Sequence, residues 1–253
     1  MEILHAADSK FFQLCFQSHA KTTRDSYYIE CGKLKLNHII AKRRLMFWHS
    51  ILKRKTSDLV HKVYQIMKLK PCRNDWIFMI ENDKVTYQIT YSDSEISQMS
   101  KLQFKNYIEL NINKKFFSEL SESSKSKVEN VKKTMIIDKR FKIQMQPYLK
   151  SNELSTKQKQ ALFSLRNRTY NLKCNYRTMY EDDMRCRSCL NDDSIEDEVH
   201  VFEECSNREE MQTNNNVKFK DIFGTLKQQI IAIKQFFPIM TKRDILLDVQ
   251  KGS

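Results

Sequence analysis

Apolar residues recur at helical spacing along most of the chain. The longest such stretch covers residues 34–55, and a repeat of three or four positions places its apolar side chains on one face of an α-helix. These side chains are Leu36, Ile39, Ile40, Phe47 and Ile51. Similar patterns predict helices at 11–16, at about 56–70, from 75 onward, at 92–120, at 157–168 and at 219–237, with a last piece at 243–249. The chain is therefore predicted to be mostly α.

Polar residues suited to helix caps stand where several of these stretches begin. A Ser, Thr, Asp or Asn side chain at this position accepts a backbone N–H that the helix itself cannot satisfy. The candidate caps are Thr56 or Ser57, Asn74 or Asp75, Ser92 or Ser94, and Ser155 or Thr156. Pro71 is expected to end the helix at 56–70.

Four stretches depart from the helical pattern. Residues 27–30 are either a strand or an extended approach to Gly32, and Val85, Tyr87, Ile89 and Tyr91 alternate with the period of a lone strand. The Ser- and Lys-rich residues 121–127 indicate a boundary. The basic residues 129–148 carry scattered apolar positions that indicate no single element.

The composition supports helices and removes some functions. The chain has 253 residues, of which only 3 are Gly and 3 are Pro, whereas sandwiches and barrels need turn residues often. No glycine-rich phosphate-binding loop is present in the sequence. Hydrophobic residues make up 40%, which is enough for a core at this length.

Cysteine usage indicates an intracellular protein, in the nucleus or cytoplasm. The number of cysteines, 7, is odd, and the sequence shows neither a secretion signal nor an apolar run long enough for a membrane span. Reduced thiols are the consistent interpretation. We expect Cys15, Cys31, Cys72 and Cys174 to be small buried residues rather than ligands.

The strongest chemical signal is an array of cysteine and histidine. Cys186, Cys189, His200 and Cys205 follow the spacing C-x2-C-x10-H-x4-C, and three thiolates with one imidazole close a tetrahedral shell around Zn²⁺. A closed shell has no position for a catalytic water, so the array predicts a structural zinc knuckle at about 178–210. The alternatives are a coincidental C-x-x-C or a redox dithiol.

A second motif lies directly upstream. Residues 180–183 spell Y-x-D-D, which in polymerases holds catalytic metal ions on a hairpin between apolar strands. Here the flanks are polar, and Cys186 follows Asp183 after only two intervening residues. A hairpin of apolar strands does not fit, and we therefore expect no enzymatic activity from this chain alone.

Charge is distributed unevenly. The net charge is +13, but residues 181–210 hold about 12 acidic and 3 basic residues, which leaves roughly +22 on the remainder. A basic body of this size suits polyanion binding, because each Lys or Arg near a phosphate releases a counterion.

Basic residues stand beside aromatic ones at two places, near the end of the helix at 34–55 and directly before the knuckle. Charge and stacking together can hold a nucleic-acid strand. A solvated basic face is the alternative. The candidate nucleic-acid-binding residues are Arg43, Arg44, Lys53, Arg54, Arg166, Arg168, Lys173 and Arg177.

The order of these features resembles the C-terminal region of reverse transcriptases encoded by non-LTR (LINE-type) retrotransposons. The resemblance spans most of residues 27–210 and is strongest at the knuckle, where residues 196–202 lead to Cys205. The other stretches are 28–32, 43–52, Asp75-Trp76, 165–168 and Asn175-Tyr176. None of these is specific alone, but their order is.

The resemblance implies a thumb-like helical region at 1–120, a basic linker at 121–150 and a helical segment with the zinc knuckle at 151–253. It also implies a non-catalytic fragment that contacts RNA or DNA, with the polymerase part of a reverse transcriptase as a candidate partner. The fingers, palm and endonuclease of that family are not found in this sequence. One alternative is a helical protein-interaction adaptor whose acidic knuckle docks a basic partner, and another is a decaying copy without function.

Overall fold

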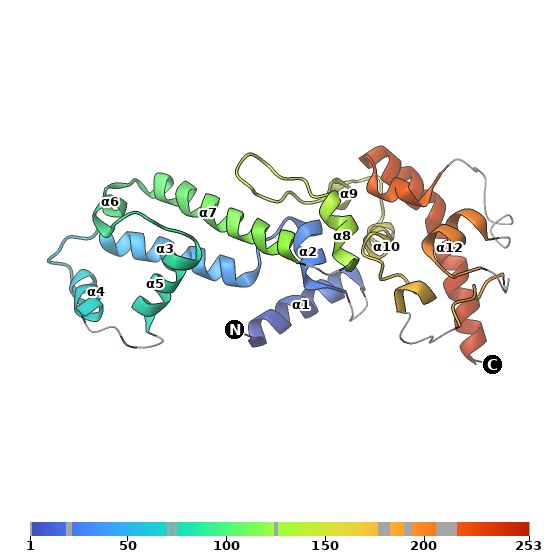
Figure 1. Cartoon of the computed structure of the whole chain (residues 1–253), viewed down its shortest axis with the longest axis horizontal. Coiled ribbons are helices and arrows are strands. Elements are labelled where there is room, and N and C mark those ends of the chain that lie inside the picture. Colours follow the sequence, from blue (N-terminus) through green and yellow to red (C-terminus); the bar gives the residue numbers. More distant parts are fainter. Residues whose placement is uncertain are drawn as a thin grey trace. The chain divides into compact units, whose positions relative to one another are not determined.

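The computed structural model is mostly helical, as the apolar pattern predicts (Figure 1). It describes residues 2–18, 22–69, 72, 75–123, 126–176, 183–189, 194–205 and 217–252. Within them there is no β-strand, and only two isolated antiparallel bridges occur. The α-helices are α1 (Glu2–Phe16), α2 (Arg24–Cys31), α3 (Leu36–Leu52), α4 (Leu59–Leu69), α5 (Trp76–Thr86), α6 (Asp93–Gln98), α7 (Lys101–Glu122), α8 (Ser126–Lys133), α9 (Pro147–Lys150), α10 (Thr156–Arg166) and α12 (Leu226–Gly252). Short helical turns are η1 (Lys173–Tyr176), the π-helix η2 (His200–Glu204) and η4 (Phe219–Phe223).

Three predicted caps are confirmed. Asp75 accepts the amide of Phe78 at the start of α5, Ser92 forms a reciprocal capping box in α6, and Ser155 does so in α10. These interactions join residues three positions apart, which is why the sequence alone reveals them. Pro71 lies outside the described residues.

The prediction of one helix over 92–120 is wrong, because the chain divides it into α6 and α7. Met99 and Ser100 both have extended backbone, and Ser100 opens a second capping box with Gln103. The sequence does contain this signal, since Ser100 and Gln103 have the same spacing as Ser92 and Glu95.

Both predicted strand regions are helical or turned instead. Residues 27–30 lie within α2, in which every residue from Asp25 to Cys31 is buried. Because all faces of this helix are buried, its apolar residues do not recur with a helical period. Val85 belongs to α5, and Gln88 with φ 54° reverses the chain between Tyr87 and Ile89. Tyr87 and Ile89 are buried by this turn, which explains their alternation.

The C-terminal helix is continuous, whereas the sequence pattern predicts two separate helices at 219–237 and 243–249. A short turn, η4, precedes α12, which runs through Pro238 to Gly252. A proline inside a helix removes one backbone hydrogen bond. Here the apolar neighbours Phe236, Ile239 and Met240 are buried, and this packing supports the helix on both sides of Pro238.

The chain forms two compact units that interleave along the sequence. The first contains residues 1–8, 32–123 and 136–144, and the second contains 9–31, 124–135 and 145–253. The stretch 121–150 therefore contributes to both. The sequence boundaries at 120 and 150 stay predictions.

In the first unit, α3 and α7 run side by side, and α4, α5 and α6 gather about one end of α3 (Figure 1). Trp48 is fully buried and donates its indole N–H to the Tyr64 hydroxyl at 3.1 Å, and that hydroxyl donates to Asp93 at 2.9 Å. His49 is buried and stacks on Phe104. Trp48 and His49, which stand in the sequence between Arg43–Arg44 and Lys53–Arg54, are therefore core residues.

In the second unit, α10 packs against α12 and η4. Its core contains Phe163 and Leu165 from α10 together with Ile233 and Phe236 from α12. Helix α10 ends where Arg168 takes φ 51° and the amide of Thr169 donates to the Ser164 carbonyl. This left-handed turn directs the chain from α10 toward η1 and the knuckle.

Among the described residues, no helix combines the length and the hydropathy that crossing a bilayer requires.

Candidate metal centre

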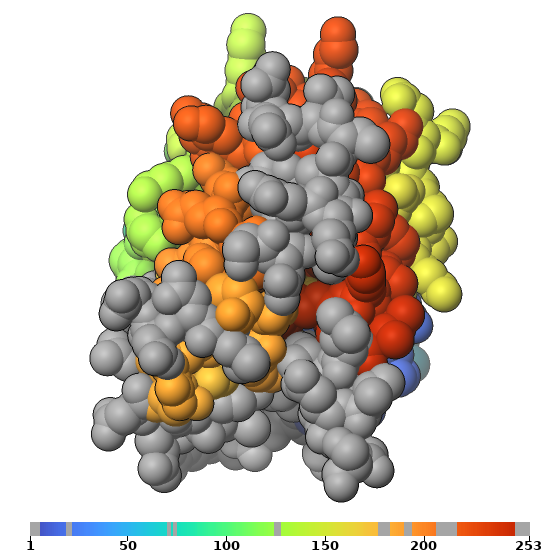
Figure 2. Space-filling view, turned by 90° about the vertical axis from the view of Figure 1, so that its right-hand side faces the viewer, coloured from blue at the N-terminus to red at the C-terminus, as the bar shows by residue number. Residues whose placement is uncertain are grey.

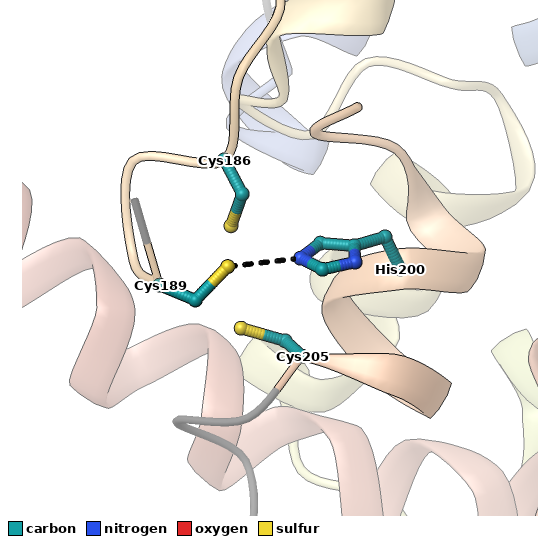
Figure 3. A group of neighbouring side chains, drawn as sticks. All are labelled: Cys186, Cys189, His200 and Cys205. Atoms are coloured by element: carbon teal, nitrogen blue, oxygen red, sulfur yellow. Dashed lines mark hydrogen bonds between the residues drawn. The ribbon is translucent and has the colours of Figure 1, made fainter. Parts of the chain in front are cut away.

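The four predicted ligands come together in the second unit (Figure 3). One donor atom from each of Cys186, Cys189, His200 and Cys205 lies within 4.8 Å of all the others. In a tetrahedral shell with Zn–S bonds of about 2.3 Å, two sulfur atoms are about 3.8 Å apart. Cys186, His200 and Cys205 are buried, and Cys189 is half-buried. The array can therefore hold a metal ion, as its spacing predicts.

Backbone pairing between residues 184–186 and 194–196 positions the C-x-x-C segment that holds Cys186 and Cys189. The amide of Cys186 donates to the Ser194 carbonyl at 3.1 Å, and the amide of Glu196 donates to Met184 at 2.8 Å. Arg185 and Ile195 form an antiparallel bridge between these bonds. The segment before Cys186 is thereby fixed against the segment that leads to His200.

The π-helix η2 places the other two ligands. Cys205 is five residues after His200, and its amide donates to the His200 carbonyl at 2.7 Å, which is the π-helical bond. An i to i+5 bond closes a wider turn than an α-helix makes. The wider turn brings the sulfur of Cys205 and the ring of His200 to the same side, where Cys186 and Cys189 lie (Figure 3).

The orientation of the His200 ring suits coordination through Nε2. Its Nε2 lies 3.3 Å from the sulfur of Cys189, and its Nδ1 lies 4.0 Å from a carboxylate oxygen of Glu204. Histidine ligands commonly direct their second nitrogen toward a carboxylate, which orients the ring. Glu204, the last residue of η2, is the carboxylate in that position.

The thiols of Cys186 and of the nearby Cys174 differ in pKa. Hydrogen bonds from Cys205 and from the backbone amides of Cys189 and Ser188 lower the pKa of Cys186 despite its burial, which favours the thiolate that binds metals. For Cys174, burial and the neighbouring Glu198 raise the pKa of the thiol to about 12. Cys174 is thus a neutral thiol outside the ligand set.

The other cysteines are only partly as predicted. All seven lie in described residues, and none forms a disulfide bond. Cys31 is buried, as expected, and Cys174 is half-buried, but Cys15 and Cys72 are exposed, so the expectation that those two are buried is wrong. The exposed pair lies at the end of α1 and after α4.

Glu196 joins the knuckle to α12, and its role was not predicted. Its carboxylate is fully buried and accepts from the side chain and the amide of Arg187, which lies between the two cysteines of the C-x-x-C turn. Arg243 of α12 forms an ion pair with the same carboxylate, and the amide of Lys173 donates to it at 3.2 Å. Burial alone would raise the pKa of Glu196, but hydrogen bonds from Arg187 and the charge of Arg243 lower it below its ordinary value.

Loss of the Glu196 charge should weaken metal binding. Glu196→Gln keeps the shape of the side chain but leaves Arg187 and Arg243 without their carboxylate. Partners that orient metal ligands are typically worth 10–100-fold in affinity, and we expect about a tenfold loss here. Competition with a chromogenic chelator measures it. Glu153→Gln, at an exposed position of the same unit, should bind metal as the unchanged chain does, and equal affinity in the two variants would refute the role of Glu196.

The candidate nucleic-acid residues of the first unit lie near the surface. Arg43, Lys53 and Arg54 are exposed, and Arg44 is half-buried. Three of them have protein partners, namely Asp83 for Arg44, the Met99 carbonyl for Lys53 and Asp58 for Arg54. The exposed pair of Arg54 and Asp58 is of the weak kind that opens readily to a phosphate, whereas the pair of Arg44 and Asp83 is mostly buried.

In the second unit, the structure contradicts two of the candidates. Arg166 was expected on a solvent face of its helix, but it is fully buried and paired with Glu30 at 2.9 Å. Lys173 is also buried and pairs with Asp183 at 2.9 Å. Neither side chain can reach a phosphate in this conformation, so both are removed from the candidate contacts.

Arg168 keeps an accessible side chain, 43% exposed, although its guanidinium lies 3.5 Å from Glu198. Arg177 lies outside the described residues, as do Tyr180, Glu181 and Asp182 of the Y-x-D-D motif. The remaining residue of that motif, Asp183, is held by Lys173 and Arg185, which keep its pKa well below the usual range.

The sequence predicts which cysteine and histidine side chains come together, but it does not predict the buried charges around them. The sequence pattern gives the acidic residues of 196–198 a place in the resemblance and in the negative charge of the knuckle, but it does not predict that Glu196 and Glu198 are buried and hydrogen-bonded. No spacing rule links Glu196 to Arg243, because the two residues are brought together by the packing of α12. On the face shown in Figure 2, residues of the segment that ends at Cys205 adjoin those of η4 and α12.

Comparison with protein-family models, with curated proteins and with solved structures finds no match to this chain.

Proposed function

We propose that the chain is a zinc-stabilised nucleic-acid-binding module of the kind found at the C-terminal end of LINE-type reverse transcriptases. The observation that carries the proposal is the convergence of Cys186, Cys189, His200 and Cys205 within 4.8 Å. Everything that concerns nucleic acid rests in addition on charge and on the resemblance of the sequence.

The donor set favours zinc over other metals. Three sulfur atoms and one imidazole in a compact shell suit Zn²⁺, whereas Mg²⁺ and Ca²⁺ prefer oxygen ligands. Four protein donors complete a tetrahedral shell, so the ion is structural and fixes the segment 183–205 against α12. When bound, the ion would replace the mutual repulsion of three thiolates with coordination bonds.

The distribution of charge supports a nucleic-acid partner for the basic remainder of the chain. Exposed Arg43, Lys53 and Arg54 lie within or beside the end of α3, and the half-exposed Arg168 follows α10. Such residues add to binding through counterion release, and their contribution falls as salt rises. In this proposal residues 1–120 correspond to the thumb-like region, and the chain contacts RNA or DNA without catalysing a reaction.

One titration tests the proposal. Metal content is measured on the purified protein, and its affinity for single-stranded RNA and duplex DNA is then measured at two salt concentrations. We expect one zinc per chain and an affinity that falls steeply with salt. One zinc without nucleic-acid binding would favour a protein-interaction adaptor, and no zinc would refute the central claim.

A further inference from the structure

A small cavity opens in the first unit between the start of α3, the middle of α7 and the loop at 136–144. Its volume is about 120 Å³, which is below the size of a typical drug-sized pocket but admits a small planar group. The residues that line it are Gly32, Lys33, Leu34, Lys42, Glu109, Asn113, Phe116, Lys142 and Ile143. The candidate metal centre contributes none of these residues.

The cavity has an apolar floor. Phe116 of α7 is 2% exposed and Ile143 of the loop is 3% exposed, and half-buried Leu34 completes the floor from the turn before α3. Gly32 stands at the edge with φ 59°, a conformation that glycine adopts without strain. A flat apolar group that enters the cavity would therefore lose contact with water on an apolar surface.

The mouth of the cavity is basic. Lys33 and Lys142 are exposed, and Lys42 is half-buried in an ion pair with Glu109. Asp138 lies near Lys142 and offsets part of its charge. Three lysines against one lining carboxylate still leave a positive rim.

Asn113 supplies a polar group inside the cavity. Its side-chain nitrogen donates to the Arg140 carbonyl at 3.1 Å, which fixes the amide and holds the loop against α7. The side-chain oxygen of Asn113 remains an acceptor on a residue that lines the cavity, whereas the carboxylate of Glu109 is paired with Lys42. Acceptors of this kind suit the N–H groups on the edge of a nucleobase.

We propose that this cavity receives one unstacked base of a single-stranded nucleic acid, with the adjoining phosphates at Lys33 and Lys142. An apolar interior beneath a cationic rim is the arrangement that binds bases and backbone together. The inference rests on the proposed function, and it adds a site that none of the candidate residues from the sequence includes. It accounts for the position of two exposed lysines around one small apolar opening.

The test compares two matched charge reversals in the full chain. Lys33→Glu with Lys142→Glu alters the rim, and Lys227→Glu with Lys234→Glu makes the same change in charge on exposed positions of α12. Each protein is titrated with a short single-stranded oligonucleotide, as RNA and as DNA, in an intact form and in a form without bases. Circular dichroism checks that both variants keep their helices.

We expect the unchanged protein to bind the intact oligonucleotide better than the abasic one. The rim variant should lose about tenfold in affinity and about 1.4 in the slope of log K against log salt, since each phosphate contact on a single strand contributes about 0.7. It should also lose the preference for bases, which the α12 variant retains. The RNA and DNA arms decide which nucleic acid supplies the base.

Two results would overturn the inference while the proposed function stands. They are equal binding of intact and abasic oligonucleotides by the unchanged protein, and equal effects of the two charge reversals. If the unchanged protein binds neither RNA nor DNA, both the proposed function and the base pocket fail.

Discussion

Cys189→Ser should release the metal and unfold the segment from 183 to 205. A serine hydroxyl does not replace a thiolate, so only three ligands would remain around the ion. Structural zinc contributes on the order of 10–16 kcal/mol to small folds of this type, and the regular secondary structure in the described part of the segment is limited to the bridge between Arg185 and Ile195 and the π-helix η2. Metal analysis should give less than one zinc per chain, and hydrogen exchange should show loss of protection over 183–205.

Cys15→Ser is the matched control for this change. Cys15 is exposed at the end of α1 and outside the ligand cluster, so the same substitution there should leave metal content and exchange unaltered. Removal of the metal from the unchanged protein with a strong chelator should reproduce the exchange pattern of Cys189→Ser. A Cys189→Ser protein that retains a full complement of zinc and normal protection would show that this thiol is not a ligand.

The unfolding caused by Cys189→Ser should not extend to the rest of the second unit. The side chains of Leu162, Phe163 and Phe236 form a core between α10 and α12. Among the described residues of the knuckle, Cys186, Val201, Phe202 and Cys205 belong to this core, and the half-buried Cys189 packs against it. We therefore expect α10 to keep its protection while α12 loses part of its own near Arg243, where the bond to Glu196 is broken.

The features that sequence reasoning predicted correctly are those in which the interacting residues are close along the chain. Asp75, Ser92 and Ser155 each cap a helix through a residue three positions later. The four candidate ligands, whose donor atoms the structure brings close together, lie within 20 residues and follow a spacing that only a few geometries satisfy. In both cases the chain itself brings the groups together, so the pattern and the structure carry the same information.

The features that it missed depend on distant parts of the chain. Residues 27–30 lack a helical pattern because α2 is buried on all sides, and the alternation of Tyr87 and Ile89 arises from a left-handed turn at Gln88. Arg166 is expected from the sequence to lie outside the core, because Leu162, Phe163 and Leu165 are predicted to form the buried face of its helix. Its partner Glu30 lies 136 residues upstream, and no local rule identifies it.

Arg166 and Glu30 should be the most sensitive charged pair in the second unit. Both side chains are fully buried, and the guanidinium also donates to the Ile222 carbonyl, the Thr134 hydroxyl and the Gln146 side chain. It lies over the rings of Tyr148 and Phe223 as well. The side chain of Arg166 thereby connects α10 with α2, α9 and η4. It also connects α10 with Thr134, which directly follows α8.

Arg166→Met should destabilise the second unit by about 3–5 kcal/mol, because it leaves the Glu30 carboxylate buried without a counter-charge. Amides of α10 should exchange roughly 100- to 4,000-fold faster, since 1.4 kcal/mol corresponds to about a factor of ten. Amides of α3 and α7, in the first unit, serve as the internal reference. Arg54→Met removes an exposed pair and should cost about 0–1 kcal/mol.

The double variant distinguishes an ion pair from simple packing. If the cost of Arg166→Met comes from the uncompensated Glu30 charge, then adding Glu30→Met should recover much of the stability, since an apolar pair of similar volume can replace a buried ion pair at little cost. If the cost comes from lost contacts with Tyr148 and Phe223, the two substitutions should add. Additive losses of stability would therefore show that Arg166 stabilises the unit through packing and not through its charge. Recovery of stability in the double variant would show that the charge of Arg166 compensates the buried carboxylate of Glu30.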